Sequence, residues 1–132
     1  MLAVREEPRL MDGVEKGKVR LPLALETESE AIERLAAAAK EIPDISRIVV
    51  FGSRVRGDFS GDSDLDLLVV IEDLRHRDRI IRLIHDLELE YDVPLSPTLY
   101  TRNEVEVNKR LGSAFFRNIE REGIVIYDAE QE

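Results

Sequence analysis

Residues 49–70 of the chain read VVFGSRVRGDFSGDSDLDLLVV, in which two apolar, β-rich runs flank a loop of glycine, serine, arginine and aspartate. The loop opens with Gly52-Ser53 and closes with Asp64-Leu65-Asp66. Because alternate residues of a strand point to the same face of a sheet, Asp64 and Asp66 are expected to project together. Two carboxylates placed in this way can share a divalent cation, so the end of the loop is a candidate metal site.

The opening of the loop has the residue types of a phosphate-binding turn. Gly52 lets the backbone approach an anion closely, and Ser53 can donate both its hydroxyl and its N–H. A helical turn that starts near Ser53 would point its first amides at the same anion. Mg²⁺ prefers carboxylate and phosphate oxygens and keeps several waters, so Asp64 and Asp66 suffice as protein ligands. The motif therefore predicts a site for a nucleoside triphosphate with Mg²⁺.

Two further loop residues, Arg54 and Ser63, are candidates for nucleotide binding. Arg54 can contact a phosphate or pair with Asp58 or Asp62, and the sequence favours neither role. Ser63 directly precedes the acid pair and can cap the loop or hydrogen-bond within it. For Arg56 a structural ion pair is favoured. The plain alternative for the whole stretch is a hairpin with an acidic, glycine-rich connection, since neither GS nor DxD is specific alone.

Outward from this motif, the chain alternates between helical and strand patterns. Predicted helices begin at Thr27 or Ser29, at Leu74, near Asn103 after a Thr101 cap, and at Ser113. Predicted strands cover residues 45–51, 65–71, 93–100 and 124–127, and prolines favour an edge or bulged position for the third. This order predicts one domain of the α/β (α+β) class over residues 27–132. Residues 1–26 form an N-terminal arm, for which disorder is favoured over a docking role.

Composition narrows the class of ligand. The chain has 132 residues and 43% hydrophobic content, which fits one domain with its own core. It has no cysteine, no apolar run near the roughly 20 residues of a membrane span, and no secretory signal, so we expect a cytoplasmic protein without a membrane partner. With 19 basic and 28 acidic residues, its net charge of −9 disfavours non-specific nucleic-acid binding. A small nucleotide is the better ligand, and homo-oligomerisation stays open.

Gly52-Ser53, ten further residues and then Asp64-x-Asp66 resemble the GSx10DxD motif of the DNA-polymerase-β-like nucleotidyltransferase superfamily. The surrounding FGSRVRGDFSGDSDLDLLVV looks especially like the minimal nucleotidyltransferases, small prokaryotic domains often encoded beside a HEPN-domain partner. The resemblance is strong over residues 45–71 and weaker through Tyr127. It implies a mixed sheet of about four strands with helices packed on one face.

The resemblance also implies an activity, in which a nucleoside monophosphate is transferred from a triphosphate with Mg²⁺ and pyrophosphate leaves. Gly52 and Ser53 would hold the triphosphate, and Asp64 and Asp66 would be the catalytic acids that ligate one or two Mg²⁺ ions. ATP is the expected donor, although another nucleoside triphosphate stays open. The acceptor would be a hydroxyl on a HEPN-type toxin, which makes this chain the antitoxin. The alternatives are a nucleotidyltransferase-fold protein that acts by binding its partner, and transfer to a small molecule.

In one respect the chain departs from the pattern of this superfamily. Active members usually carry a third carboxylate on the strand after the next helix, where it binds metal and helps to activate the acceptor. The aligned position here is Ser96, and the nearest acid is Asp92. Either Asp92 serves as the third carboxylate or the site has two acids only. General-base assistance of this kind is typically worth about 10²–10⁴-fold in rate.

Overall fold

The computed structural model describes residues 9–10, 26–56 and 64–131. Its centre is a five-stranded mixed sheet in the order β1-β5-β2-β3-β4. The strands are β1 (Arg9–Leu10), β2 (Ile45–Phe51), β3 (Leu65–Ile71), β4 (Leu95–Thr101) and β5 (Ile124–Asp128). β2 runs antiparallel to both β3 and β5, whereas β4 is parallel to β3. The predicted α+β class and mixed sheet are confirmed, and β1 extends the four expected strands.

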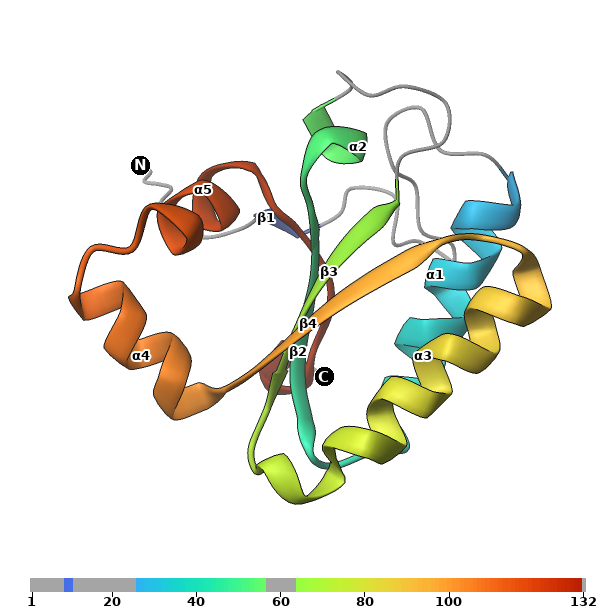
Figure 1. The fold of residues 1–132 in the computed structure, drawn as a ribbon, viewed down its shortest axis with the longest axis horizontal. Coiled ribbons are helices and arrows are strands. Elements are labelled where there is room, and N and C mark those ends of the chain that lie inside the picture. The colour runs from blue at the N-terminus through green and yellow to red at the C-terminus, as the bar shows by residue number, and fades with distance from the viewer. Residues whose placement is uncertain (1–8, 11–25, 57–63, 132) are drawn as a thin grey trace.

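Five α-helices surround this sheet in the described part of the chain. They are α1 (Glu26–Ala39), α2 (Ser53–Arg56), α3 (Arg77–Tyr91), α4 (Arg102–Arg110) and α5 (Ala114–Glu122). Two single turns of 3₁₀ helix, η2 (Leu74–His76) and η3 (Ala129–Gln131), precede α3 and follow β5. α1 and α3 lie on one side of the sheet, and α4 and α5 lie on the other (Figure 1). None of the described helices is long and apolar enough to cross a membrane.

The larger core lies between the sheet and the α1–α3 layer. Alternate residues of β3, from Leu65 through Ile71, point into it and are almost fully buried. They pack with Ile32 and Leu35 of α1 and with Ile84 of α3. Leu68 and Val70 lie between them, face the opposite side and are also buried, which explains why the strand is apolar at every position after Asp66 rather than alternating.

A second, smaller core lies on the opposite face and accounts for the difference from the expected single helical layer. Leu68 and Val70 of β3 are apolar on this face, and α5 covers them with Phe116 and Ile119. Asp66 precedes Leu68 by two positions in the same strand, so its carboxylate belongs to this face of the sheet. The fold therefore places the acid motif at one end of the α4–α5 side.

Local signals set several element boundaries. Thr101 caps α4 in a capping box with Glu104, and Ser113 caps α5, as the sequence predicts. α1 begins at Glu26 rather than at Thr27 or Ser29. Within the predicted arm, Arg9–Leu10 pairs with β5 at the sheet edge. Residues 1–8 and 11–25 lie outside the described residues, so the boundary of the arm stays a prediction.

Candidate functional site

The two halves of the motif meet where β2 ends beside the start of β3. Phe51 is paired in register with Asp66, and Gly52 follows it with φ of 92°. This is a left-handed conformation that favours glycine. A Cβ at Gly52 would also overlap Oδ2 of Asp66, so the backbone of the turn touches the carboxylate. Both the backbone angle and the close approach therefore require glycine at this position.

Ser53 begins the short helix α2, as predicted for the residue after the turn. The Gly52 carbonyl accepts hydrogen bonds from the N–H groups of Val55 and Arg56, each at 3.1 Å. Ser53 itself is half-buried, next in the chain to the glycine that touches Asp66. Ser53 therefore follows directly after the residue whose backbone lies against the Asp66 carboxylate, and its role in phosphate binding stays a prediction.

The acid pair has the electrostatics of a cation site. Asp64 is exposed just before β3, and Asp66 is half-buried inside it. Burial raises the pKa of Asp66, and the negative charge of Asp64 raises it further, while the charge of Arg56 lowers it. The two negative charges therefore repel each other, and a divalent cation bound by both carboxylates would relieve that repulsion. Carboxylate oxygens are the donors that Mg²⁺ prefers, so this set fits the metal.

The structure shows where the two candidate positions for the third carboxylate lie. In the parallel pairing of β3 with β4, Asp66 lies directly beside Ser96, so serine occupies the neighbouring strand position. Asp92 lies earlier, in the turn that ends α3, with a left-handed φ of 56° and an exposed side chain. Within the described residues, no three acidic, histidine or cysteine side chains form a metal-sized group. The register therefore places a serine beside Asp66, and a role for Asp92 as the third carboxylate stays a prediction.

Arg54 lies in a buried ion pair with a residue of another helix. Its side chain is only 6% exposed, and one guanidinium nitrogen, Nη2, donates to both carboxylate oxygens of Glu28 at 2.6 Å. Glu28 comes from α1 and is equally buried. The ion pair ties α2 to α1 and favours the structural role for Arg54 over nucleotide binding. The sequence did not identify Glu28, because it resembles any acid in the first turn of a helix.

Arg56 is a candidate that the sequence undervalued. It forms the expected kind of ion pair, with Glu122 of α5 at 3.2 Å, and its side chain is exposed. Its positive charge also lowers the pKa of Asp66, so it lies close enough to act on the acid pair. An exposed cation beside such a pair can contact a phosphate oxygen. The other predicted residues of the loop, Asp58, Asp62 and Ser63, lie outside the described residues.

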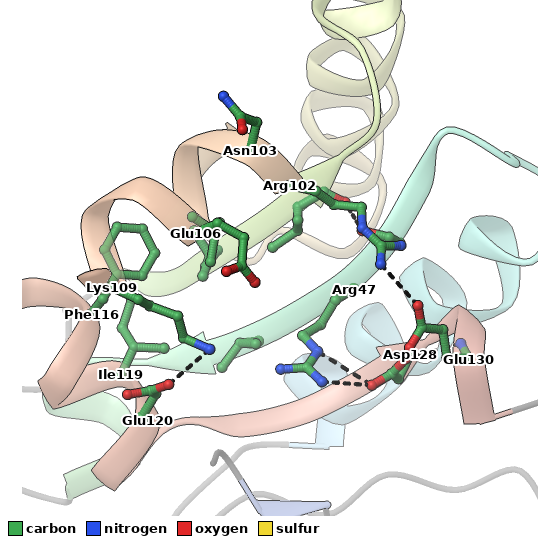
Figure 2. Close-up of a pocket in the computed structure, with 15 residues that line it drawn as sticks. Arg47, Arg102, Asn103, Glu106, Lys109, Phe116, Ile119, Glu120, Asp128 and Glu130 are labelled. Carbon is green, nitrogen blue, oxygen red and sulfur yellow. Dashed lines mark hydrogen bonds and ion pairs between the residues drawn. The ribbon is translucent and has the colours of Figure 1, made fainter. Parts of the chain in front are cut away.

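An aromatic cluster continues the site along the same face of the sheet. Phe51, next to Gly52, meets Phe115 edge to face with ring centroids 5.5 Å apart. Phe115 in turn contacts Phe116, and both contact Tyr100. Beyond this cluster the face is hollowed into a cavity of about 460 Å³ under α4 (Figure 2). The acid motif, the aromatic cluster and the cavity thus share one face.

Comparisons with known proteins identify the family of this chain. The family described as polymerase beta, nucleotidyltransferase, matches residues 33–132. MJ0141 and MJ0604 of Methanocaldococcus jannaschii are named as candidate protein adenylyltransferases. They are 29% and 35% identical to this chain over 105 and 102 residues. The alignments cover 74% and 76% of this chain and 99% and 98% of the relatives.

Among solved structures, a chain from a crystal structure of a toxin–antitoxin with AMP-PNP has a similar fold, with a TM-score of 0.51 and 21% identity. The match covers 81% of this chain and 77% of that one. The family match extends over most of the chain and includes the glycine–serine turn and the acid pair that the fold brings together. The chain is therefore a nucleotidyltransferase and belongs to the polymerase-β family.

Proposed function

We propose that this protein transfers AMP from ATP, with Mg²⁺, to a side-chain hydroxyl of a partner protein. The observation that carries the proposal is the contact between the Gly52 turn and the Asp66 carboxylate, which joins a phosphate turn to a cation site. The names of the two archaeal relatives, both candidate protein adenylyltransferases, support AMP as the group and a protein as the acceptor.

Each residue of the motif has a separate task in this proposal. Asp64 and Asp66 would hold Mg²⁺, which neutralises charge on the phosphates when it is bound. The Gly52 backbone and Ser53 would hold the triphosphate against this pair. Arg56 would supply a further positive charge at the phosphates. Its exposure leaves the guanidinium able to move from Glu122 to a ligand.

The transfer is a displacement at the α-phosphorus of ATP. The acceptor oxygen forms a bond to that phosphorus, the bond to the bridging oxygen of the β-phosphate breaks, and pyrophosphate leaves. The acceptor loses its proton to water or to a nearby carboxylate. Ser96, which stands where a third acid would assist this step, cannot serve as a base of comparable strength. We therefore expect slow transfer that depends on good positioning of the acceptor.

A HEPN-type toxin is the proposed partner, which makes this chain its antitoxin. The structural neighbour named as a toxin–antitoxin with AMP-PNP supports both a nucleotide and such a context. The test combines the protein with labelled ATP, Mg²⁺ and the HEPN-like product of an adjacent gene. The expected result is label on the partner and none with the Asp64→Asn/Asp66→Asn variant. Absence of label with ATP and with the other three nucleoside triphosphates would reject the proposal.

A second candidate function is neutralisation of the toxin by binding alone, and Ser96 beside Asp66 is the observation that favours it. The two functions separate in the double asparagine variant, which should still neutralise the partner only if binding is sufficient. Ser96→Asp adds a second test, because it restores a carboxylate at the neighbouring strand position. Its transfer rate should rise by up to about 10²-fold over the wild type if chemistry limits the reaction, with Ser96→Asn as the uncharged control.

A further inference from the structure

The cavity under α4 has an apolar floor on the face of the sheet that carries Asp66. The floor residues come from β2, β3 and α5, and they are Val49, Leu68, Val70, Phe116 and Ile119. All five are nearly or fully buried. A volume of about 460 Å³ is within the range of sites that bind small ligands or single large side chains. The floor would therefore favour a ligand with an apolar body.

The rim of the cavity is charged, and its cations already have partners. Three cations line the rim, and each is ion-paired with a carboxylate at 2.8 to 2.9 Å. The pairs are Arg47–Asp128, Arg102–Glu130 and Lys109–Glu120. An anionic ligand would have to displace one of these carboxylates to reach a cation. Among the described residues, the rim therefore offers an anion no cation that lacks a carboxylate partner.

Glu106 is the exception among the charged residues of the rim. Its carboxylate projects from α4 into the space above the sheet (Figure 2). Within the described residues it takes part in no ion pair and no hydrogen bond, and the side chain is exposed. A positively charged ligand group can meet this carboxylate without breaking any existing pair. The charge of the rim therefore selects for a cation.

Lysine and arginine side chains combine these two properties, because an apolar stem carries a charged head. The stem would lie on the apolar floor while the head reaches Glu106. The net charge of −9 on the whole chain also attracts a basic partner at long range. A basic segment of another protein is therefore the occupant that matches both the lining of the cavity and the negative net charge of the chain.

The position of the cavity relative to the acid pair limits how such a segment could bind. Leu68 and Val70 line the cavity and stand two and four positions after Asp66 in β3. At about 3.3 Å per residue, these two cavity residues lie about 7 Å and about 13 Å from Asp66 along the strand. An extended segment covers these distances in two to four residues.

We propose that the cavity is the docking site for a lysine or arginine of the acceptor protein, two to four residues from the hydroxyl that receives AMP. The basic side chain anchors on Glu106 and the apolar floor, and the intervening residues cross the aromatic cluster of Phe51 and Phe115. This docking site rests on the proposed transfer of AMP to a protein. It adds to that proposal a preference for a basic residue near the acceptor hydroxyl.

Binding is tested first, without nucleotide, by fluorescence anisotropy of labelled nine-residue peptides. Each peptide carries one arginine or lysine beside apolar residues, and its matched partner carries citrulline or acetyl-lysine instead. The charged peptides should bind the wild type roughly tenfold more tightly than the neutral ones. Glu106→Gln should abolish that difference. Glu90→Gln, an exposed change of the same kind on α3 in the opposite layer, should retain it.

Transfer is then measured with the same peptides after a threonine is placed two to four, or seven, residues from the basic residue. Labelling should favour the shorter spacings in the wild type and show no preference in Glu106→Gln. Equal binding of charged and neutral peptides, or a charge preference that survives Glu106→Gln, would overturn the docking site. Charge-dependent binding without any labelling would instead reject the proposed transfer and leave the docking site standing.

Discussion

The conformation of Gly52 brings the turn after β2 into contact with the Asp66 carboxylate. Its left-handed φ of 92° and its contact with Asp66 leave no room for a side chain. We expect Gly52→Ala to lower transfer and Mg·ATP affinity at least tenfold, because the turn or the carboxylate must move. Backbone strain alone costs about 1–3 kcal/mol of stability. Calorimetric ATP titration and chemical denaturation measure the two effects separately.

Gly112 provides a matched control for this substitution. It has a comparable φ of 74°, but a Cβ there would meet only the end of the Arg117 side chain at 3.5 Å. Gly112→Ala should therefore carry similar backbone strain and leave ATP affinity unchanged. If Gly112→Ala weakened ATP binding as much as Gly52→Ala, general destabilisation would be the cause, and the specific role of Gly52 would be wrong.

Asp66 is expected to reduce stability in the absence of metal. Its pKa is raised above the usual 3.8 by burial and by Asp64. A carboxyl whose folded pKa is raised stabilises the fold below the unfolded pKa, and that contribution is lost as pH rises through the folded pKa. At pH 7 the ionised group therefore opposes folding. Asp66→Asn should raise the Tm of the metal-free protein at pH 7, and this advantage should shrink as the pH falls through the raised pKa of Asp66 towards the usual 3.8.

The same titration bears on metal binding. Protons compete with Mg²⁺ for Asp66, so the affinity for Mg²⁺ should fall as pH drops through the raised pKa. Differential scanning calorimetry with and without Mg²⁺ across pH 4–8 would record both trends. If the Tm of metal-free Asp66→Asn at pH 7 were equal to or below that of the wild type, the conclusion that ionised Asp66 opposes folding would be wrong.

At the scale of the elements, the attachment of α2 to α1 supports the motif. Glu28→Gln would remove the carboxylate charge that pairs with the buried Arg54 guanidinium, and the loss of a buried ion-pair partner costs about 3 kcal/mol in comparable cases. Because Arg54 follows Ser53 directly, ATP affinity should fall as well. Glu130→Gln removes an exposed partner of Arg102 and should cost less than about 1 kcal/mol. Urea denaturation compares the two, and similar losses of stability would show that the buried pair has no special role.

The elements also show what the sequence predicts and what it leaves open. The predicted strands 45–51 and 65–71 coincide with β2 and β3, because each is a continuous apolar run bounded by turn residues. The register that sets Ser96 beside Asp66 agrees with the predicted alignment, and β4 with its internal Pro97 is an edge strand as expected. These features depend on local patterns, which a single sequence contains.

Features that depend on distant residues could not be predicted in this way. The amphipathic pattern of α5 indicates a buried face but not which side of the sheet receives it, so the second helical layer was missed. The partner of Arg54 lies 26 positions away in α1. The cavity combines residues as far apart in the sequence as Ser46 and Glu130, and no local stretch encodes it.

At the scale of the whole molecule, ligand binding and stability should be linked through the motif. A nucleotide that bound across the turn, α2 and the start of β3 would stabilise the folded state, because it would bind the folded protein and not the unfolded chain. At a free Mg·ATP concentration 100 times the Kd, the expected stabilisation is about 2.7 kcal/mol. A Tm increase of several degrees should therefore appear in a thermal-shift assay.

This increase should require both components of the site. ATP with EDTA, or Mg²⁺ alone, should shift the Tm much less than the two together, because the metal joins the phosphates to Asp64 and Asp66. The double asparagine variant should show no dependence on Mg²⁺, whereas Glu90→Gln should respond as the wild type does. A full shift in the double variant would place the nucleotide elsewhere on the molecule, and the Gly52–Asp66 contact would then be a feature of the fold alone.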